Sequence, residues 1–135
     1  MPAFTPCLMF VGEQHGRAEA AVMYYVGLFP NAQIETIDRY GPGDDEPVGT
    51  VRQAVFSLDG QRFVAMDSHH PHPFTFTPAV SVRVGCKTVQ EVDSVFAGLA
   101  NGGTVLMELE RYPFADRFGW VNDRFGVSWQ VLLES

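Results

Sequence analysis

The sequence has few cysteines, few basic residues and no long apolar run, and each shortage excludes a class of protein. Nine lysines and arginines stand against 16 aspartates and glutamates, so the net charge is −7. This balance argues against a nucleic-acid partner, which requires clustered positive charge. No segment approaches the roughly 20 apolar residues that span a bilayer, so we expect no membrane partner. The two cysteines, Cys7 and Cys86, have no close spacing and make no metal motif.

The start of the chain, MPAFTPCLMF, has neither the basic region nor the cleavage-site pattern of a signal peptide. Two thiols without an export signal favour a reduced, cytoplasmic protein. A length of 135 residues suits one domain with a real core, and we expect a single domain over residues 1–135. Eleven phenylalanines, four tyrosines and two tryptophans favour a sheet-rich core or an aromatic-lined pocket.

Apolar periodicity predicts the same order of elements twice. The first set has strands over 5–11, 32–40, 50–58 and 61–67, and a helix over 15–29 whose apolar stripe includes Tyr25. The second set has strands over 78–85 and 104–109, a helix over 88–100 capped by Thr88 and Glu91, and a closing hairpin over 118–135. The halves, about 1–72 and 73–135, share this order but no obvious sequence identity. We predict an α+β fold in which two βαβββ modules form curved mixed sheets around a cavity.

Connecting segments are marked by turn residues, by acidic residues and by histidines. Asp59-Gly60 is a two-residue hairpin signal, and the segment 41–49 (GPGDDEPVG) is predicted to be an exposed acidic loop. The segment 68–77 (SHHPHPFTFT) is irregular. Its histidines, His69, His70 and His72, are either exposed residues of a crossover or an alternative ligand cluster, and the sequence leaves open whether they bind anything.

The last strand interrupts an apolar pattern with polar residues. Because successive side chains of a strand point to opposite faces, Ser128 and Gln130 share one face and the apolar residues the other. The apolar face consists of Val127, Trp129, Val131 and Leu133. We predict that Trp129 lies in the core and that Asp123 caps the preceding turn. Gln130 then faces inward, where it contacts either a ligand or water, or only its protein neighbours.

Four segments carry a family signal: TPCLMFVG, YYVGLFPNAQI, FSLDGQRFVAMD and GWVNDRFGVSWQV. They resemble the PhnB-like, or demethylubiquinone methyltransferase-like, branch of the glyoxalase/bleomycin-resistance (vicinal oxygen chelate) superfamily. The resemblance covers nearly the whole chain. It implies the glyoxalase fold, a homodimer and a small-molecule ligand.

Metal-using members of that superfamily hold one divalent ion with His, Gln or Glu at four inward strand positions. Carried onto this chain, those positions fall at Pro6, Ala79 and Gln130, and near residues 65–67. Proline and alanine offer no ligand atom, and a glutamine carbonyl with one carboxylate is too small a donor set. We therefore predict no metal at this site and no cofactor.

The ligand site is expected to include polar and aromatic residues that can face the cavity. These candidates are Gln130, Ser128, Ser81, Arg83, Asp67, His72, Trp120 and Tyr40. An inward Arg83 requires an anion; alternatively it pairs at an edge with Asp67 or Glu108. Trp120 is either core or pocket wall. No Ser-His-Asp or Cys-His motif is present, so no catalytic residue is assigned.

These observations predict a metal-free protein that binds a small organic molecule. The alternative is a metal-independent, or weakly metal-dependent, enzyme that acts on a small polar substrate through Arg83, His72 or Gln130. A purely structural dimer is a third class. The methyltransferase name gains no support from the residues, because Gly41-Pro42-Gly43 lies between two strands and lacks the strand-to-helix turn typical of S-adenosylmethionine sites.

Overall fold

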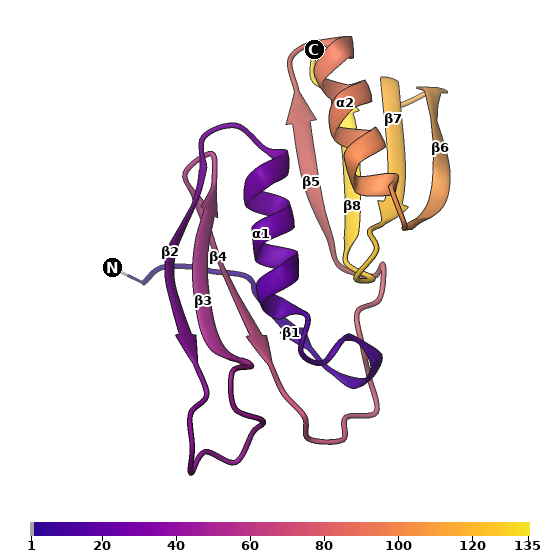
Figure 1. Cartoon of the computed structure of the whole chain (residues 1–135). Coiled ribbons are helices and arrows are strands. Elements are labelled where there is room, and N and C mark those ends of the chain that lie inside the picture. The colour runs from indigo at the N-terminus through magenta and orange to yellow at the C-terminus, as the bar shows by residue number, and fades with distance from the viewer. Residues whose placement is uncertain (1) are drawn as a thin grey trace. The chain divides into compact units, whose positions relative to one another are not determined.

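The computed structural model describes residues 2–135 and divides into two compact units, Met1–Thr75 and Phe76–Ser135 (Figure 1). Each unit contains one α-helix and one four-stranded mixed sheet, in the order strand, helix, three strands. The predicted α+β repeat of two βαβββ modules is therefore confirmed. That the units form a single domain over residues 1–135 stays a prediction.

Unit 1 builds its sheet from the first four strands. Its elements are β1 (Cys7–Phe10), α1 (Ala18–Leu28), β2 (Ala32–Arg39), β3 (Val51–Leu58) and β4 (Gln61–Asp67). The sheet order is β1-β4-β3-β2, with β1 parallel to β4 and the other pairs antiparallel. Asp59 and Gly60 adopt φ values of 50° and 86°, which two-residue hairpin turns require, so the predicted hairpin between β3 and β4 is confirmed.

Helix α1 packs one apolar stripe on the unit-1 sheet. Its fully buried residues are Ala18, Ala21, Val22 and Tyr25. The Tyr25 ring stacks on Phe56 of β3 with centroids 6.2 Å apart, and Phe56 stacks on Phe63 of β4 at 5.3 Å. The register predicted for this helix is confirmed, although the helix begins at Ala18 and not at His15.

The late start of α1 is explained by a carboxylate from a distant strand. Asp67, at the end of β4, is 1% exposed and accepts backbone hydrogen bonds on both oxygens. Its Oδ1 accepts from Gly16 N (2.9 Å) and Ala18 N (3.2 Å), and its Oδ2 accepts from Val51 N (2.9 Å). An anion at a helix N-terminus satisfies unpaired N–H groups and interacts well with the helix dipole. Asp67 therefore holds α1, β3 and β4 together.

Unit 2 repeats the topology with the remaining elements. These are β5 (Ser81–Cys86), α2 (Val89–Ala100), β6 (Thr104–Tyr112), β7 (Ala115–Asn122) and β8 (Ser128–Leu133). The sheet order is β5-β8-β7-β6, with β5 parallel to β8. The predicted cap of α2 is confirmed, because Thr88 Oγ1 accepts from Glu91 N at 3.1 Å. The Glu91 carboxylate in turn accepts from Lys87 N at 3.0 Å.

Helix α2 covers one face of the unit-2 sheet. A Cβ at Gly119 of β7 would collide with Phe96 of α2, so the helix lies on the face that carries Gly119 and its β8 neighbour Val131. Trp129 lies in the core at 1% exposure, as predicted. Asp123 caps the β7–β8 turn, also as predicted: its Oδ1 accepts from Phe125 N and Val127 N, and its Oδ2 accepts from Trp129 Nε1 at 2.9 Å.

The two cysteines are free and differ in exposure. Cys86 is 1% exposed, and burial, followed by the negative charges of Glu91 and Glu134, raises its pKa to about 11. Cys7 is exposed because β1 is an edge strand, and its register with Val64 places it on the face opposite α1. Neither helix within residues 2–135 has the length and apolar character needed to cross a membrane.

Candidate functional site

Five of the eight predicted site residues come together on the face of the unit-2 sheet opposite α2, here called the open face. They are Ser81, Arg83, Trp120, Ser128 and Gln130. Parallel pairing of β5 with β8 places Ser81 beside Ser128 and Arg83 beside Gln130. Antiparallel pairing of β7 with β8 places Trp120 on the other side of Gln130. Because Val131 and Gly119 face α2, the alternation of side chains sends these five to the open face.

Three of these side chains satisfy one another's hydrogen bonds. The Ser81 and Ser128 hydroxyl oxygens lie 2.7 Å apart, and Trp120 Nε1 donates to Ser128 Oγ at 2.8 Å. Ser128 is only 2% exposed, whereas Trp120 remains partly accessible. The two hydroxyls therefore fix the indole edge and leave part of the indole surface available as a rigid wall. This places Trp120 partly in the core and partly on an accessible surface.

Arg83 and Gln130 lie next to each other without protein partners. Within residues 2–135, neither side chain makes a hydrogen bond or an ion pair. Arg83 is exposed and Gln130 is partly buried. The alternative pairing of Arg83 with Glu108 does not occur among the described residues, because β6 lies at the opposite edge of the sheet from β5. The donors of Arg83 and the amide of Gln130 therefore remain available.

A cleft of about 480 Å³ begins at Arg83. It is lined by Arg83, by residues 113–116 in the β6–β7 turn and at the start of β7, and by residues 132–135 at the chain end. Phe114 in this turn is 64% exposed and packs edge-on against Phe118, with ring centroids 4.9 Å apart. The cleft thus combines a guanidinium with an exposed aromatic ring, while Asp116 and Glu134 add negative charge to its rim.

The other three predicted site residues lie in unit 1 and have local partners. Asp67 is occupied by the backbone N–H groups described above. His72 Nε2 lies 3.2 Å from Ser68 Oγ, and its ring packs against Phe74 at 4.9 Å. The Arg52 guanidinium lies 5.4 Å from the Tyr40 ring centroid. Burial, followed by the negative charge of Glu46, raises the pKa of Tyr40. A ligand-binding role for these three stays a prediction.

The superfamily's metal positions carry no suitable donor set in this chain. Pro6 precedes β1, and Ala79 lies in the turn before β5. On β4, Asp67 bonds to the N-terminus of α1, so the alternate residue Met66 faces the other side of the sheet. The carboxylate counted as one doubtful ligand is therefore directed at α1, and the residues present do not fit a metal ion at these positions.

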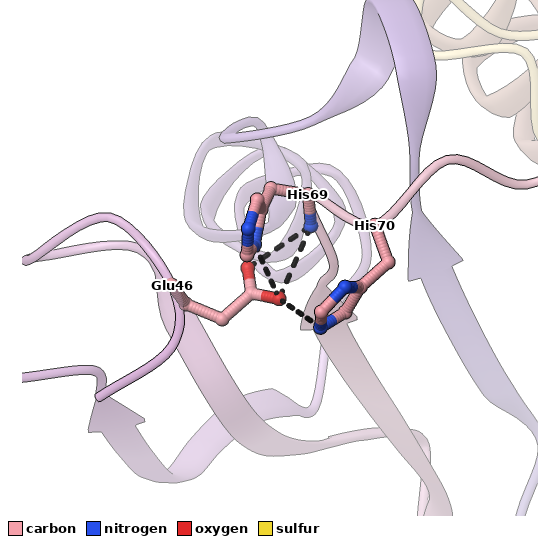
Figure 2. Close-up of side chains that lie close together, drawn as sticks. All are labelled: Glu46, His69 and His70. Atoms are coloured by element: carbon pink, nitrogen blue, oxygen red, sulfur yellow. Dashed lines mark hydrogen bonds and ion pairs between the residues drawn. The ribbon is translucent and has the colours of Figure 1, made fainter.

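A second polar cluster gathers around Glu46 in unit 1 (Figure 2); the sequence analysis named its histidines as possible ligands but missed Glu46. Glu46 lies in the segment predicted to be an exposed loop, yet its side chain is only 6% exposed. Its Oε2 lies 2.8 Å from His69 Nδ1 and 3.6 Å from His70 Nε2. The available signal was the pairing of an acidic loop with a histidine-rich segment, but periodicity cannot show that the two meet.

Comparison with known proteins identifies the family. The family model for 3-demethylubiquinone-9 3-methyltransferase matches residues 2–132. A PhnB protein from Bacillus cereus is 46% identical, with 98% of this chain and 100% of that chain covered and a TM-score of 0.92. Protein PA1353 from Pseudomonas aeruginosa is 26% identical, with 99% and 98% covered and a TM-score of 0.83.

More distant structures share the fold. A glyoxylase/bleomycin resistance protein/dioxygenase domain from Frankia sp. EAN1pec is 12% identical, with 100% of this chain and 98% of that chain covered and a TM-score of 0.68. None of the curated proteins compared with the chain matches it significantly. The chain therefore belongs to the PhnB-like, 3-demethylubiquinone-9 3-methyltransferase family and has the glyoxalase/bleomycin resistance fold.

Proposed function

We propose that this chain binds a small organic molecule with an anionic group on the open face of the unit-2 sheet, without a metal at that face. The observation that carries the proposal is the adjacent pair Arg83 and Gln130, which makes no hydrogen bond or ion pair within residues 2–135. Arg83 is exposed and Gln130 is partly buried, so the polar groups of both side chains are open to a ligand that approaches from solvent. A ligand that bonds to both side chains would supply the partners that the described residues do not.

The side chains of the open face define the class of ligand. A guanidinium presents five N–H donors in a planar fork, which matches a carboxylate or phosphate group. The Gln130 amide both donates and accepts, so it suits a neighbouring hydroxyl or carbonyl. Trp120 and Phe114 offer aromatic surface for an apolar part of the molecule. These features favour a small organic acid with an apolar or aromatic portion.

Two further observations support ligand binding without a metal at the superfamily's positions and without methyl transfer. Pro6 and Ala79 supply no metal ligand at the superfamily's positions. The methyl transfer in the family's name would require a site for a methyl donor, but Gly41-Pro42-Gly43 lies in the β2–β3 loop, where Gly41 N donates to the Asp44 carboxylate at 2.6 Å. The free thiols Cys7 and Cys86 support a reducing, cytoplasmic location for this binding function.

A ligand screen tests the proposal. Purified full-length chain is screened by thermal shift against small carboxylic and phosphate-containing acids, each paired with its neutral amide or alcohol. We expect acids to raise the melting temperature and their neutral partners to do so less, because Arg83 recognises the charge. No stabilisation by any member of the set, or equal stabilisation by neutral partners, would contradict the proposal.

Matched variants then locate the site by calorimetry. Arg83→Ala and Gln130→Ala should each weaken binding of the best acid, Arg83→Ala by about tenfold or more, because a charge-assisted hydrogen bond contributes about 1.5–3 kcal/mol. The controls are Arg62→Ala and Gln53→Ala, exposed residues of the unit-1 sheet. Equal losses in controls and test variants would place the ligand elsewhere. Product analysis after incubation with the bound acid separates binding from turnover.

A further inference from the structure

The cluster around Glu46 brings together three segments of unit 1 that are distant in sequence. Glu46 lies in the β2–β3 loop, His69 and His70 follow β4, and His15 lies in the turn before α1. The loop is closed at its base by Tyr40 N–H to Thr50 O (2.8 Å) and Gly49 N–H to Tyr40 O (2.9 Å). This base and the end of β4 hold the carboxylate and the two imidazoles at one point (Figure 2).

Glu46 is positioned as a buried anion. His69 approaches it twice: its backbone N–H donates to Oε1 (3.0 Å) and Oε2 (3.2 Å), and its Nδ1 lies 2.8 Å from Oε2. Burial alone would raise the pKa of Glu46. The hydrogen bonds from His69 and the charges of His69 and His70 together outweigh burial, so the pKa lies below its ordinary value. The Glu46 carboxylate is therefore held in a fixed position by His69.

The distances among the ligand atoms suit a tetrahedral metal ion. One ligand atom each from Glu46, His69 and His70 lies within 4.8 Å of the other two. Ligands of a tetrahedral Zn²⁺ at bond lengths of about 2.0–2.1 Å lie about 3.3 Å apart. The 3.6 Å between His70 Nε2 and Glu46 Oε2 is close to this value, and the 2.8 Å contact from His69 would have to lengthen by about 0.5 Å.

His15 provides an independent sign that the cluster is incomplete. Its Nε2 is buried and has no hydrogen-bond partner within residues 2–135, yet it lies 3.8 Å from Glu46 Oε1. Buried polar atoms rarely lack a partner, and such an atom calls for an explanation such as a bound ion or water. A water in the fourth position of an ion held by Glu46, His69 and His70 would offer His15 a partner.

We propose that Glu46, His69 and His70 form a binding site for a divalent transition metal, with Zn²⁺ as the best match. Imidazole and carboxylate donors together suit Zn²⁺, whereas Mg²⁺ and Ca²⁺ require oxygen ligands. The site uses none of the residues at the superfamily's strand positions and none of the five residues of the open face. On binding, the ion replaces the proton that His69 Nδ1 shares with Glu46. If the His69 ring is an imidazolium, that proton leaves to solvent. If the ring is neutral, Nδ1 releases its proton to solvent and Nε2 takes one up.

A zinc titration of the untagged full-length chain tests the site. Protein stripped with a chelator is titrated with Zn²⁺ in competition with a chromogenic chelator, in a Cys7→Ser background because Cys7 is an exposed thiol. We expect one equivalent of Zn²⁺, and affinity losses of about tenfold or more in His69→Ala and His70→Ala.

His72→Ala is the matched control, because His72 lies in the same segment but contacts Ser68 and Phe74 instead of Glu46. It should bind zinc as the parent does. Thermal unfolding without metal checks that each variant is folded. His70→Ala keeps the proposal testable if Glu46 or His69 variants unfold, because the His70 ring is exposed and approaches Glu46 and Asp45 no closer than 3.6 Å and 3.7 Å. Absence of binding in the parent, retention in the His69→Ala/His70→Ala double variant, or an equal loss in His72→Ala would overturn it.

Discussion

Replacing Asp67 should destabilise the protein far more than the loss of one charge suggests. Its carboxylate is 1% exposed and accepts from three backbone N–H groups on both sides of the unit-1 core. Asp67→Ala removes all three acceptors at once. Gly16 is exposed, so its N–H can bond to water instead. Ala18 and Val51 are 0% and 1% exposed, so their N–H groups have no substitute.

The magnitude follows from those two buried donors. Leaving a buried donor unsatisfied costs about 1–3 kcal/mol, so Asp67→Ala should lower the free energy of unfolding by on the order of 4 kcal/mol. Asp67→Asn keeps one acceptor oxygen. Its NH₂ group replaces the other oxygen and then faces a backbone N–H, so two donors meet. We expect a cost of about 2 kcal/mol for that variant. Domains are stable by about 5–15 kcal/mol, so both effects are large.

Urea unfolding followed by circular dichroism measures these losses, and amide exchange at Ala18 and Val51 shows where they arise. Asp45→Asn is the matched control: it removes the same charge from a side chain that is 90% exposed, and should change stability by less than about 0.5 kcal/mol. An Asp67→Ala loss below about 1 kcal/mol, with an unchanged urea dependence, would refute the structural role of this carboxylate.

Three further predictions concern the core, the thiols and assembly. Tyr25→Ala should cost on the order of 3 kcal/mol or more by urea unfolding, because the ring is fully buried against Phe56; a change within error would show that the stripe does not pack. With a thiol reagent at about pH 8, Cys7 should react faster than Cys86, although burial raises the pKa of both thiols; equally fast reaction would contradict the burial of Cys86. Light scattering should report a homodimer of twice 15.0 kDa at micromolar concentration, and a monomer mass would exclude it.

The fold was predictable from sequence because its signals are local. The β3–β4 turn needs Asp59 and Gly60 in left-handed conformations, and the cap of α2 needs only Thr88 and Glu91. The start of α1 was not predictable in this way. Its N–H groups bond to Asp67, 49 residues away from Ala18, and no local cap marks the boundary. The helical periodicity therefore extended back to His15, where the chain is still in a turn.

The open face could be predicted from a local sequence pattern, whereas the cluster around Glu46 could not. Alternation along β8 placed Ser128 and Gln130 on one face, because a strand's side-chain period is local. The Glu46 cluster depends on the contact between a loop and a segment that follows a later strand. The acidic composition of the loop indicated exposure, whereas closure of its base buries one of its three acidic residues against His69. Composition cannot identify which residue that is.

The two modules share a topology but use their polar side chains differently, and this makes the two proposals independent. In unit 1, Asp67 and Glu46 are both buried acceptors that fix loops and a helix to the sheet. In unit 2, Arg83 and Gln130 lie on a sheet face with no partner among residues 2–135. The hydrogen bonds described for Asp67 and Glu46 all lie within unit 1. Zinc affinity should therefore be unchanged in Arg83→Ala, and affinity for an organic acid should be unchanged in His70→Ala.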